Sequence, residues 1–437
     1  MRTLRAHRIA HTHARARLGD RGKRERALDA ADARLLFCVV VLGPCVCCRL
    51  ALLAFLEKEH PHVLCIGETK LQESHLRDVE VQLRELLPGH TAHWAVSVPP
   101  AKKGYSGLVA LVEDSLHAQL PGGCSGGLTA DARERAGAGG AASGGSGGGG
   151  ENAKKDGTKQ QSISAMFAKA GGKQTKATRE AAEAGAGGGP VGLASVVEGL
   201  GARSSGGTFE PFEREYNAEG RTLTLDMGSF ALVCAYVPNS GADLVRLDYR
   251  IDVWEEDIKA HMAALGKPVV YMGDLNVAVR LPLCERVRAR LLSLMLTRSP
   301  PVCTSGVCGA RAHPQHLDLD IWNVGAKHLE KSAGTTPRER EAFGALLDAG
   351  YVDTFRALHP DARHAYTFWS VRARNRPWNR GLRLDYVLAS ANMAPVDGEG
   401  APSQALPRVM DSWVGPEYNT NGDHCPVGAT IALPSPE

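Results

Sequence analysis

The run PVVYMGDLNVA at residues 268–278 is apolar, short enough to be a buried strand, and ends directly in polar side chains. Similar apolar runs recur along the chain, and amphipathic helical sequence lies between some of them from about Leu244 to Ala264 and from 335 onward. The other runs are VLCIGE at 63–68, GLVALV at 107–112, TLTLDM at 222–227, FALVCAYV at 230–237, LDYVLA at 384–389 and VGATIA at 427–432. Strands that alternate with helices and with adjacent strands predict a layered α/β domain with mixed sheets.

The composition restricts the class of protein. The chain has 437 residues, 43% of them hydrophobic and 23% charged, which supports at least one sizeable core and excludes a collagen-like or wholly disordered chain. Eleven cysteines without repeated CxxC pairs are too few for a disulfide scaffold and predict a reducing compartment. A formal net charge of +3 means that any nucleic-acid surface must be local.

Residues 1–49 are predicted to be an N-terminal extension. Five arginines precede the first acidic residue, Asp20, as in an organellar transit peptide or a basic tail. The apolar stretch 35–48 contains Pro44 and is shorter than the roughly 18–20 residues of a membrane span, so it predicts a buried strand rather than an anchor. Residues 50–437 then form the main domain.

Two insertions, at residues 119–205 and 279–315, are expected to interrupt this domain. Residues 119–205 are rich in Gly and Ala, with 13 Gly in the stretch 121–150, and predict a disordered loop because they bury too little apolar surface. Within this loop, four residues fit the spacing of sliding-clamp-binding peptides, with a chance pattern in a basic linker as the alternative. They are Gln160, Ile163, Met166 and Phe167.

Four short strings place polar side chains where predicted strands end or begin, which is where sheet-based enzymes assemble sites. Glu68 closes an apolar strand, so its carboxylate must be paired, hydrogen-bonded or bound to a cation. Asp274 and Asn276 alternate and project to the same side. Each string alone also fits a turn or a capped loop. The strings are IGETK at 66–70, AYVPNSG at 235–241, MGDLNVA at 272–278 and NGDHCPV at 421–427.

Together and in this order, the strings resemble the exonuclease III-type abasic-site (AP) endonucleases of the endonuclease/exonuclease/phosphatase superfamily, from about Leu50 to Leu433 outside the insertions. Further strings support the resemblance: GYSG at 104–107, EGR at 219–221, LVRLDYR at 244–250, AGTTPRER at 333–340, YTFW at 366–369 and RLDYVLAS at 383–390. It implies a DNase I-like, four-layered α/β sandwich, with two packed mixed β-sheets flanked by helices and with the catalytic domain at 50–437.

The resemblance also implies an activity. The expected enzyme is a DNA-(apurinic or apyrimidinic site) endonuclease that uses Mg²⁺, or Mn²⁺ in its place, to cut 5′ to abasic sites in base excision repair. A 3′–5′ exonuclease or 3′-phosphodiesterase activity is an expected addition. The expected partners are double-stranded DNA with abasic sites and a DNA sliding clamp. The chain is expected to be a monomer and not to bind a membrane. The expected compartment is the nucleus, with mitochondrion or chloroplast as alternatives.

Site residues follow from the resemblance, because phosphodiester hydrolysis needs a cation, a base for water and charge stabilisation. Glu68 would bind the metal, and Asp274 would orient or deprotonate water beside Asn276. His424, held by Asp385, would contact the scissile phosphate. The catalytic set is Tyr236, Asp274, Asn276, Asp385 and His424, and the metal set is Glu68, Asp274, Asn276, Asp423 and His424.

Substrate contacts are expected from three more residues. Asn239, with Tyr236, would hydrogen-bond the phosphate. Phe368, with Trp369 behind it, would wall the pocket for the extruded sugar, while core packing is the alternative for both aromatic residues.

Two segments depart from the family pattern. The family's first strand carries an SWNxxG-like string, which is missing before Leu50; either a different strand fills that slot or the recorded N-terminus is not the functional one. The missing Asn leaves a noncatalytic DNA- or clamp-binding relative as the alternative function, and a nuclease for other 3′ ends or RNA as a second. Deleting the 37 residues Val279–Gln315 would fuse the flanks into the family's continuous motif, so we hypothesise a retained intron there.

Overall fold

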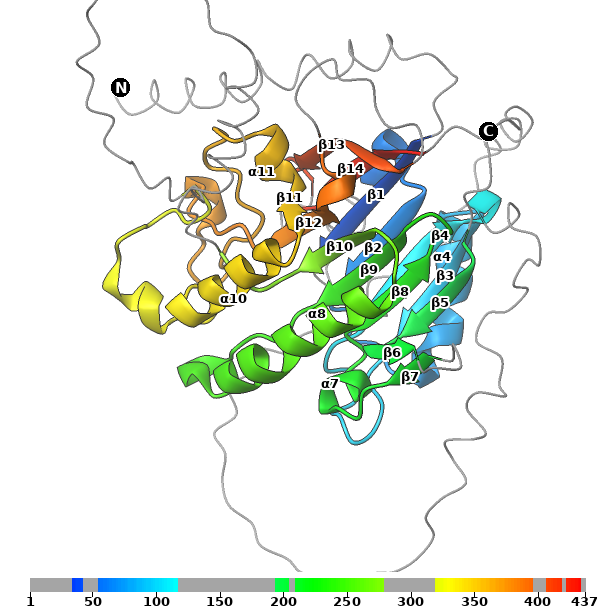
Figure 1. Cartoon of the computed structure of the whole chain (residues 1–437), viewed down its shortest axis with the longest axis horizontal. Helices are drawn as coiled ribbons and strands as arrows, with labels where there is room; N and C mark the ends of the chain where they lie inside the picture. Colours follow the sequence, from blue (N-terminus) through cyan, green and yellow to red (C-terminus); the bar gives the residue numbers. More distant parts are fainter. Residues whose placement is uncertain are drawn as a thin grey trace, which may run out of the picture.

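The computed structural model describes residues 34–41, 54–116, 193–203, 209–278, 319–395, 406–418 and 422–433. Two six-stranded mixed sheets lie face to face at its centre (Figure 1). The first sheet has the order β13-β14-β1-β2-β4-β3, and the second has the order β11-β12-β10-β9-β8-β5. Strands β6 and β7 form a separate hairpin.

The first sheet consists of β1 (Arg34–Val41), β2 (Val63–Gly67), β3 (His90–Ala95), β4 (Leu108–Glu113), β13 (Arg408–Val414) and β14 (Val427–Ala432). The second consists of β5 (Ser195–Glu198), β8 (Thr222–Asp226), β9 (Ala231–Tyr236), β10 (Val269–Asp274), β11 (Tyr351–Asp353) and β12 (Asp385–Ser390). The hairpin strands are β6 (Gly201–Arg203) and β7 (Phe209–Pro211).

The labelled α-helices are α4 (Leu76–Leu86), α7 (Glu215–Ala218), α8 (Glu255–Ala264), α10 (Pro337–Asp348) and α11 (Thr354–Leu358), and residues 54–59 are also helical. Short helical turns are η2 (Glu73–His75), η3 (Asp114–Leu116), η4 (Ala242–Leu244), η6 (Lys327–Lys331), η7 (Arg376–Trp378) and η8 (Ala391–Met393), and the π-helical η5 (Tyr249–Trp254) leads into α8.

Alternating side chains of both sheets form the inter-sheet core, because successive residues of a strand point to opposite faces. The outer face of the first sheet packs against α4, and the outer face of the second packs against α8 and α10. Every residue of β2 and β10 is buried as a result, which is why these strands are continuous apolar runs. The predicted four-layered α/β sandwich is confirmed.

The N-terminal segment contributes a strand to this fold. β1 runs parallel to β2 and antiparallel to β14, inside the first sheet. Part of the expected extension 1–49 therefore belongs to the domain, and the strand predicted within 35–48 is observed as Arg34–Val41. No helix among the described residues is long and apolar enough to span a membrane.

The end of the expected insertion 119–205 also needs correction. Residues 195–198 form β5, which pairs with β8 at the edge of the second sheet, and Val196 packs against the inter-sheet core. The apolar pair in SVVE supplies the burial that the preceding Gly-rich sequence lacks.

One disulfide crosses the inter-sheet core, between Cys65 on β2 and Cys234 on β9. No spacing in the sequence indicates the pair, because the two cysteines lie 169 residues apart on strands of different sheets.

Candidate active site

Three strand ends bring Tyr236, Asp274 and Asp385 side by side in the second sheet. β9 and β10 are parallel, and the last residue of β9, Tyr236, is opposite the last residue of β10, Asp274. β12 is antiparallel to β10, and its first residue, Asp385, is opposite Asp274 on the other side. Asp274 therefore lies between a tyrosine and a second aspartate at one edge of the sheet.

Side-chain hydrogen bonds hold the turn after β10. Asp274 Oδ1 accepts from the backbone N–H of Asn276 at 2.8 Å, and the Asn276 amide donates to the carbonyl of Val237 at 2.9 Å. Asn239 donates its amide to Asn276 Oδ1 at 2.8 Å. Only glycine fits at Gly273, because a Cβ there would lie 1.8 Å from a backbone oxygen of β9. The turn therefore fixes Asp274, Asn276 and Asn239 relative to one another.

His424, from the loop before β14, is hydrogen-bonded to Asp385. Its Nδ1 lies 2.8 Å from Asp385 Oδ2, and both side chains are buried. Burial alone would lower the pKa of His424, but the carboxylate of Asp385 and its hydrogen bond, together with Asp274 and Asp423, raise that pKa to about 10. The ring is therefore a buried imidazolium at neutral pH.

The pKa of Asp274 is also raised, but by burial and by a neighbouring like charge. Burial and then repulsion from Asp385 raise its pKa to about 8, although His424 and the N–H of Asn276 favour the ionised form. A carboxyl group with a pKa near the working pH accepts protons more readily than an ordinary aspartate. The arrangement suits Asp274 to the role of a base for water.

Glu68 lies directly after β2 with a positive φ of 54°. Its carboxylate is 2.5 Å from Lys70 Nζ, and the side chain is 22% exposed. Burial opposes ionisation, but Lys70, a hydrogen bond from Tyr236 and the charge of His424 hold the pKa of Glu68 below its usual value. Burial and the charges of Glu68 and Asp274 raise the pKa of Tyr236, so its hydroxyl keeps its proton and stays a donor.

Phe368 and Trp369 both adjoin the His424 loop but differ in burial. The centroid of the Phe368 ring is 5.0 Å from that of His424, and Phe368 is half-buried, so it forms a wall beside the imidazole. Trp369 is buried, its backbone N–H donates to the carbonyl of Asp423 at 2.7 Å, and the Arg376 guanidinium lies 4.2 Å from its ring centroid. Trp369 therefore supports the loop from behind, while the Asp423 side chain is half-buried.

Sequence reasoning gave no role to three buried charged residues that position this site. Arg250 is fully buried, donates to two carbonyls of the turn after β10 at 2.6 and 2.7 Å, and lies 3.4 Å from Glu339. Arg221 donates to the carbonyl of Tyr236 at 3.0 Å, with its guanidinium 4.9 Å from the tyrosine ring centroid. All three lie in strings that carry the family resemblance, namely EGR, LVRLDYR and TTPRER. Their place in these strings was the sequence signal that could have identified them.

The residues fit a hard cation with few protein ligands. In the part of the chain that the structure describes, no three His, Cys, Asp or Glu side chains gather as a metal cage. The predicted five-residue metal set stays a prediction: in the metal-free protein Asp274 accepts a hydrogen bond within its own turn, and His424 is hydrogen-bonded to Asp385. Glu68 is ionised and partly exposed, and Mg²⁺ commonly binds one or two carboxylates and keeps water ligands. Repulsion among Glu68, Asp274 and Asp385 also leaves negative charge that a cation relieves.

Two sequence expectations near the site remain. β1 ends beside β2, with Val41 opposite Gly67, so a first strand is present next to Glu68, but its sequence RLLFCVVV contains no Asn and no acid. The clamp-motif residues and the segment 279–315 lie outside the described residues. The described flanks of that segment come together, because Ala278 and Ile321 pack in one apolar cluster.

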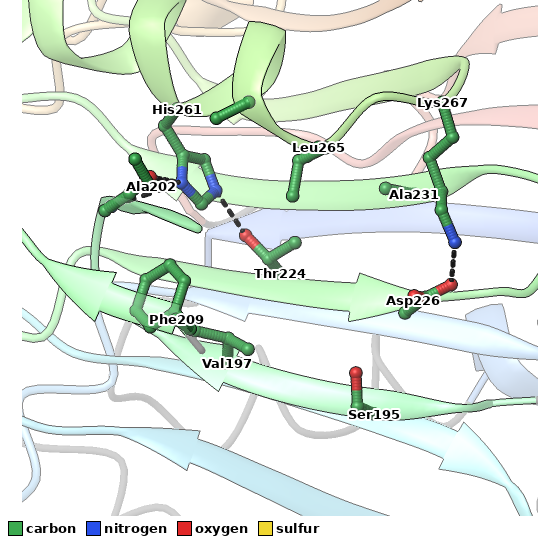
Figure 2. Close-up of a pocket in the computed structure, with 12 residues that line it drawn as sticks. Ser195, Val197, Ala202, Phe209, Thr224, Asp226, Ala231, His261, Leu265 and Lys267 are labelled. Carbon is green, nitrogen blue, oxygen red and sulfur yellow. Dashed lines mark hydrogen bonds and ion pairs between the residues drawn. The ribbon is translucent and has the colours of Figure 1, made fainter. Parts of the chain in front are cut away.

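A separate cavity of about 30 Å³ lies between the outer face of the second sheet and α8 (Figure 2). His261 there contacts Thr224 and the carbonyl of Gly201, both at 2.8 Å, and burial lowers its pKa. The volume suits one or two water molecules, and none of the predicted site residues lines it. We assign it to packing.

Comparison with known proteins matches the chain to one family of nucleases and phosphatases and to two curated nucleases within it. The model of the Endonuclease/Exonuclease/phosphatase family matches residues 42–405. The chain is 36% identical over 230 residues to the DNA repair nuclease APEX1 of Danio rerio, covering 52% of this chain and 56% of that protein. It is 33% identical to a DNA-(apurinic or apyrimidinic site) endonuclease of Dictyostelium discoideum, covering 50% and 47%. The chain thus spans about half the length of these two curated relatives.

Solved structures show the same fold at lower identity. The AP endonuclease of Leishmania major aligns with a TM-score of 0.57 at 22% identity, covering 94% of this chain and 91% of that one. An AP endonuclease of Archaeoglobus fulgidus aligns with a TM-score of 0.50 at 16% identity, covering 90% and 98%.

Proposed function

Because the chain belongs to the endonuclease/exonuclease/phosphatase family, we propose that it is a Mg²⁺-dependent endonuclease that cuts DNA 5′ to abasic sites. The observation that carries the proposal is the row of Tyr236, Asp274 and Asp385, with His424 bonded to Asp385 and Glu68 nearby. This geometry supports phosphodiester hydrolysis. The choice of abasic DNA is supported by the relatives, one of which is named for apurinic or apyrimidinic sites.

The chain's residues divide the work of hydrolysis. A divalent cation beside Glu68 would neutralise the phosphate and polarise its oxygens. Asp274 accepts a proton from water as the water oxygen bonds to phosphorus and the bond to the 3′ oxygen breaks; the 3′ oxygen leaves as an alkoxide and takes a proton from solvent water to become the 3′ hydroxyl. His424 donates a charged hydrogen bond to a phosphate oxygen through Nε2, because Nδ1 is held by Asp385.

Tyr236 and Asn239 orient the same phosphate in this proposal. The Tyr236 hydroxyl is a donor because its raised pKa keeps it protonated, and Asn239 is anchored through Asn276. Phe368 faces the imidazole and offers an apolar wall to an extruded sugar.

Incision of a duplex oligonucleotide with one tetrahydrofuran abasic mimic tests the proposal. We expect cleavage 5′ to the mimic in Mg²⁺, slower or equal cleavage in Mn²⁺, none in EDTA, and a product with a 3′ hydroxyl. Cleavage only at 3′ ends, or only of RNA, would assign the chain to a different nuclease of the family.

The sequence of β1 favours a second candidate, a noncatalytic DNA- or clamp-binding relative. The strand next to Glu68 lacks the amide that the family resemblance implies. Binding of the duplex without metal-dependent turnover would support this candidate.

We further propose a DNA sliding clamp as a partner, through Gln160, Ile163, Met166 and Phe167. Tethering to a clamp raises the effective concentration of an enzyme at DNA. A peptide spanning 154–176 is expected to bind a clamp and to lose binding with Phe167→Ala. No measurable binding by the unaltered peptide would end this proposal.

A further inference from the structure

Two tryptophans on the surface contact the same arginine. Four of the six tryptophans are buried, whereas Trp322 is 41% exposed and Trp378 is 63% exposed. The Cζ atom of Arg380 lies 5.1 Å from the ring centroid of Trp322 and 6.0 Å from that of Trp378. Exposed tryptophan rings that gather in one place mark a binding surface more often than packing. We call these three residues, Trp322, Trp378 and Arg380, the tryptophan–arginine stack.

Backbone pairing connects this stack to the candidate active site. Isolated bridges join His424 to Phe368, Phe368 to Leu382, and Leu382 to Ile321. The next residue along, Trp322, donates its backbone N–H to the carbonyl of Gly381 at 3.1 Å. The stack therefore belongs to the same layer of short pairings that holds the imidazole.

The sequence around Trp378 and Arg380 is basic. The sequence between Asp361 and Asp385 contains six arginines and no acidic residue. Of these, Arg363, Arg372, Arg374 and Arg380 are exposed, whereas Arg383 is buried and paired with Asp320 and Asp353. Aromatic rings set among exposed cations suit single-stranded nucleic acid, because bases stack on the rings and phosphates pair with the cations.

We propose that the tryptophan–arginine stack binds an unpaired nucleobase of the DNA strand that is held at the active site. The inference rests on the proposed function, because it takes the substrate to be DNA. It extends that function by giving the enzyme a preference for abasic sites next to unpaired nucleotides, as in a gap or a frayed end. An acidic protein partner on the same surface is the alternative outcome.

Binding of fluorescent oligonucleotides by the full chain in EDTA tests the inference without cleavage. One probe is a fully paired duplex with a tetrahydrofuran site, and the other has the same site beside a three-nucleotide gap. We expect Trp378→Ala and Trp322→Ala each to weaken binding of the gapped probe about tenfold more than binding of the paired probe. Trp378→Phe is expected to recover most of the difference, because a phenyl ring still stacks.

Val81→Ala is the matched control, because Val81 is 56% exposed on α4, which packs on the other sheet. A 2-aminopurine placed in the gap reports stacking directly: its emission is expected to fall on binding and to recover with Trp378→Ala. Equal losses on both probes, a Phe variant as weak as the Ala variant, or no change in emission would overturn the inference.

The two proposals can fail separately. A chain that distinguishes the gapped from the paired probe but never incises would overturn the proposed activity and leave the stack supported. A chain that incises in Mg²⁺ but binds both probes equally in all variants would overturn the stack alone.

Discussion

The imidazole of His424 is charged in the metal-free protein because Asp385 contacts it, and this has a consequence for stability. The ordinary pKa of 6.5 rises to about 10 in the folded chain, so the ion pair contributes fully below about pH 6.5. The contribution is lost as pH rises through the window from about 6.5 to 10. We expect the free energy of unfolding in EDTA to fall by on the order of 1–3 kcal/mol across that window.

Urea denaturation at several pH values measures this fall. His424→Gln should remove this group's share of the fall, so that the curve of the variant is flat above about pH 8. Asp274, whose pKa rises from 3.8 to about 8, adds a separate decline from about pH 4 to 8 that the His424 variant retains. A rise in stability over the upper window would contradict the assigned charge of His424.

For single residues, the sequence predicted which side chains form the site but not their protonation states. Glu68, Tyr236, Asp274, Asp385 and His424 were predicted to share a site, and the structure brings them together. Their roles stay predictions. The pKa values could not be predicted from sequence, because they depend on burial and on which charges meet across strands.

At the scale of elements, the turn after β10 depends on a buried ion pair. Arg250→Leu leaves the buried Glu339 without its arginine partner and two turn carbonyls without their donor. We expect a loss of about 3–5 kcal/mol in the free energy of unfolding, measured by urea titration, with a loss of incision activity.

Arg338→Leu is the matched control for this variant. Arg338 pairs with Asp248 and Asp252 on the surface, where solvent screens the charges. Its midpoint of unfolding should stay close to that of the unaltered chain. Similar destabilisation by both variants would refute a special role for the buried pair.

Local sequence signals predicted some elements well. TTPRERE predicted a helix start, and α10 begins there with Thr336 as N-cap, Pro337 in the first turn and a capping box to Glu339. β1 and β5 were assigned to an extension and an insertion because the sequences around them are basic or Gly-rich. Their pairing with β2 and β8 depends on long-range contacts that no local window contains.

At the scale of the whole molecule, the sheet order follows from pairings between distant segments. The bond between Cys65 and Cys234, and the contact of both Trp322 and Trp378 with Arg380, therefore could not be predicted from spacing. The two-sheet sandwich itself could be expected from the family resemblance.

The hypothesis of a retained intron gives a prediction at this scale. Ala278 and Ile321 pack in one cluster, and Ala278 donates to the carbonyl of Gly334, so a chain lacking Val279–Gln315 should fold with at least equal thermal stability. RNA reads joining the codons of Ala278 and His316 would support the hypothesis. Their absence in deep data, or unfolding of the shortened chain, would count against it.

If Asp274 and His424 carry hydrolysis of DNA 5′ to an abasic site, single-turnover incision of the tetrahydrofuran duplex in Mg²⁺ must depend on both side chains. We predict that Asp274→Asn and His424→Gln each lower the rate by at least about 10²-fold while circular dichroism stays unchanged. Asp252→Asn, an exposed aspartate on η5, should incise like the unaltered chain. Incision by the Asp274 or His424 variant at the unaltered rate would exclude these catalytic roles for the two side chains.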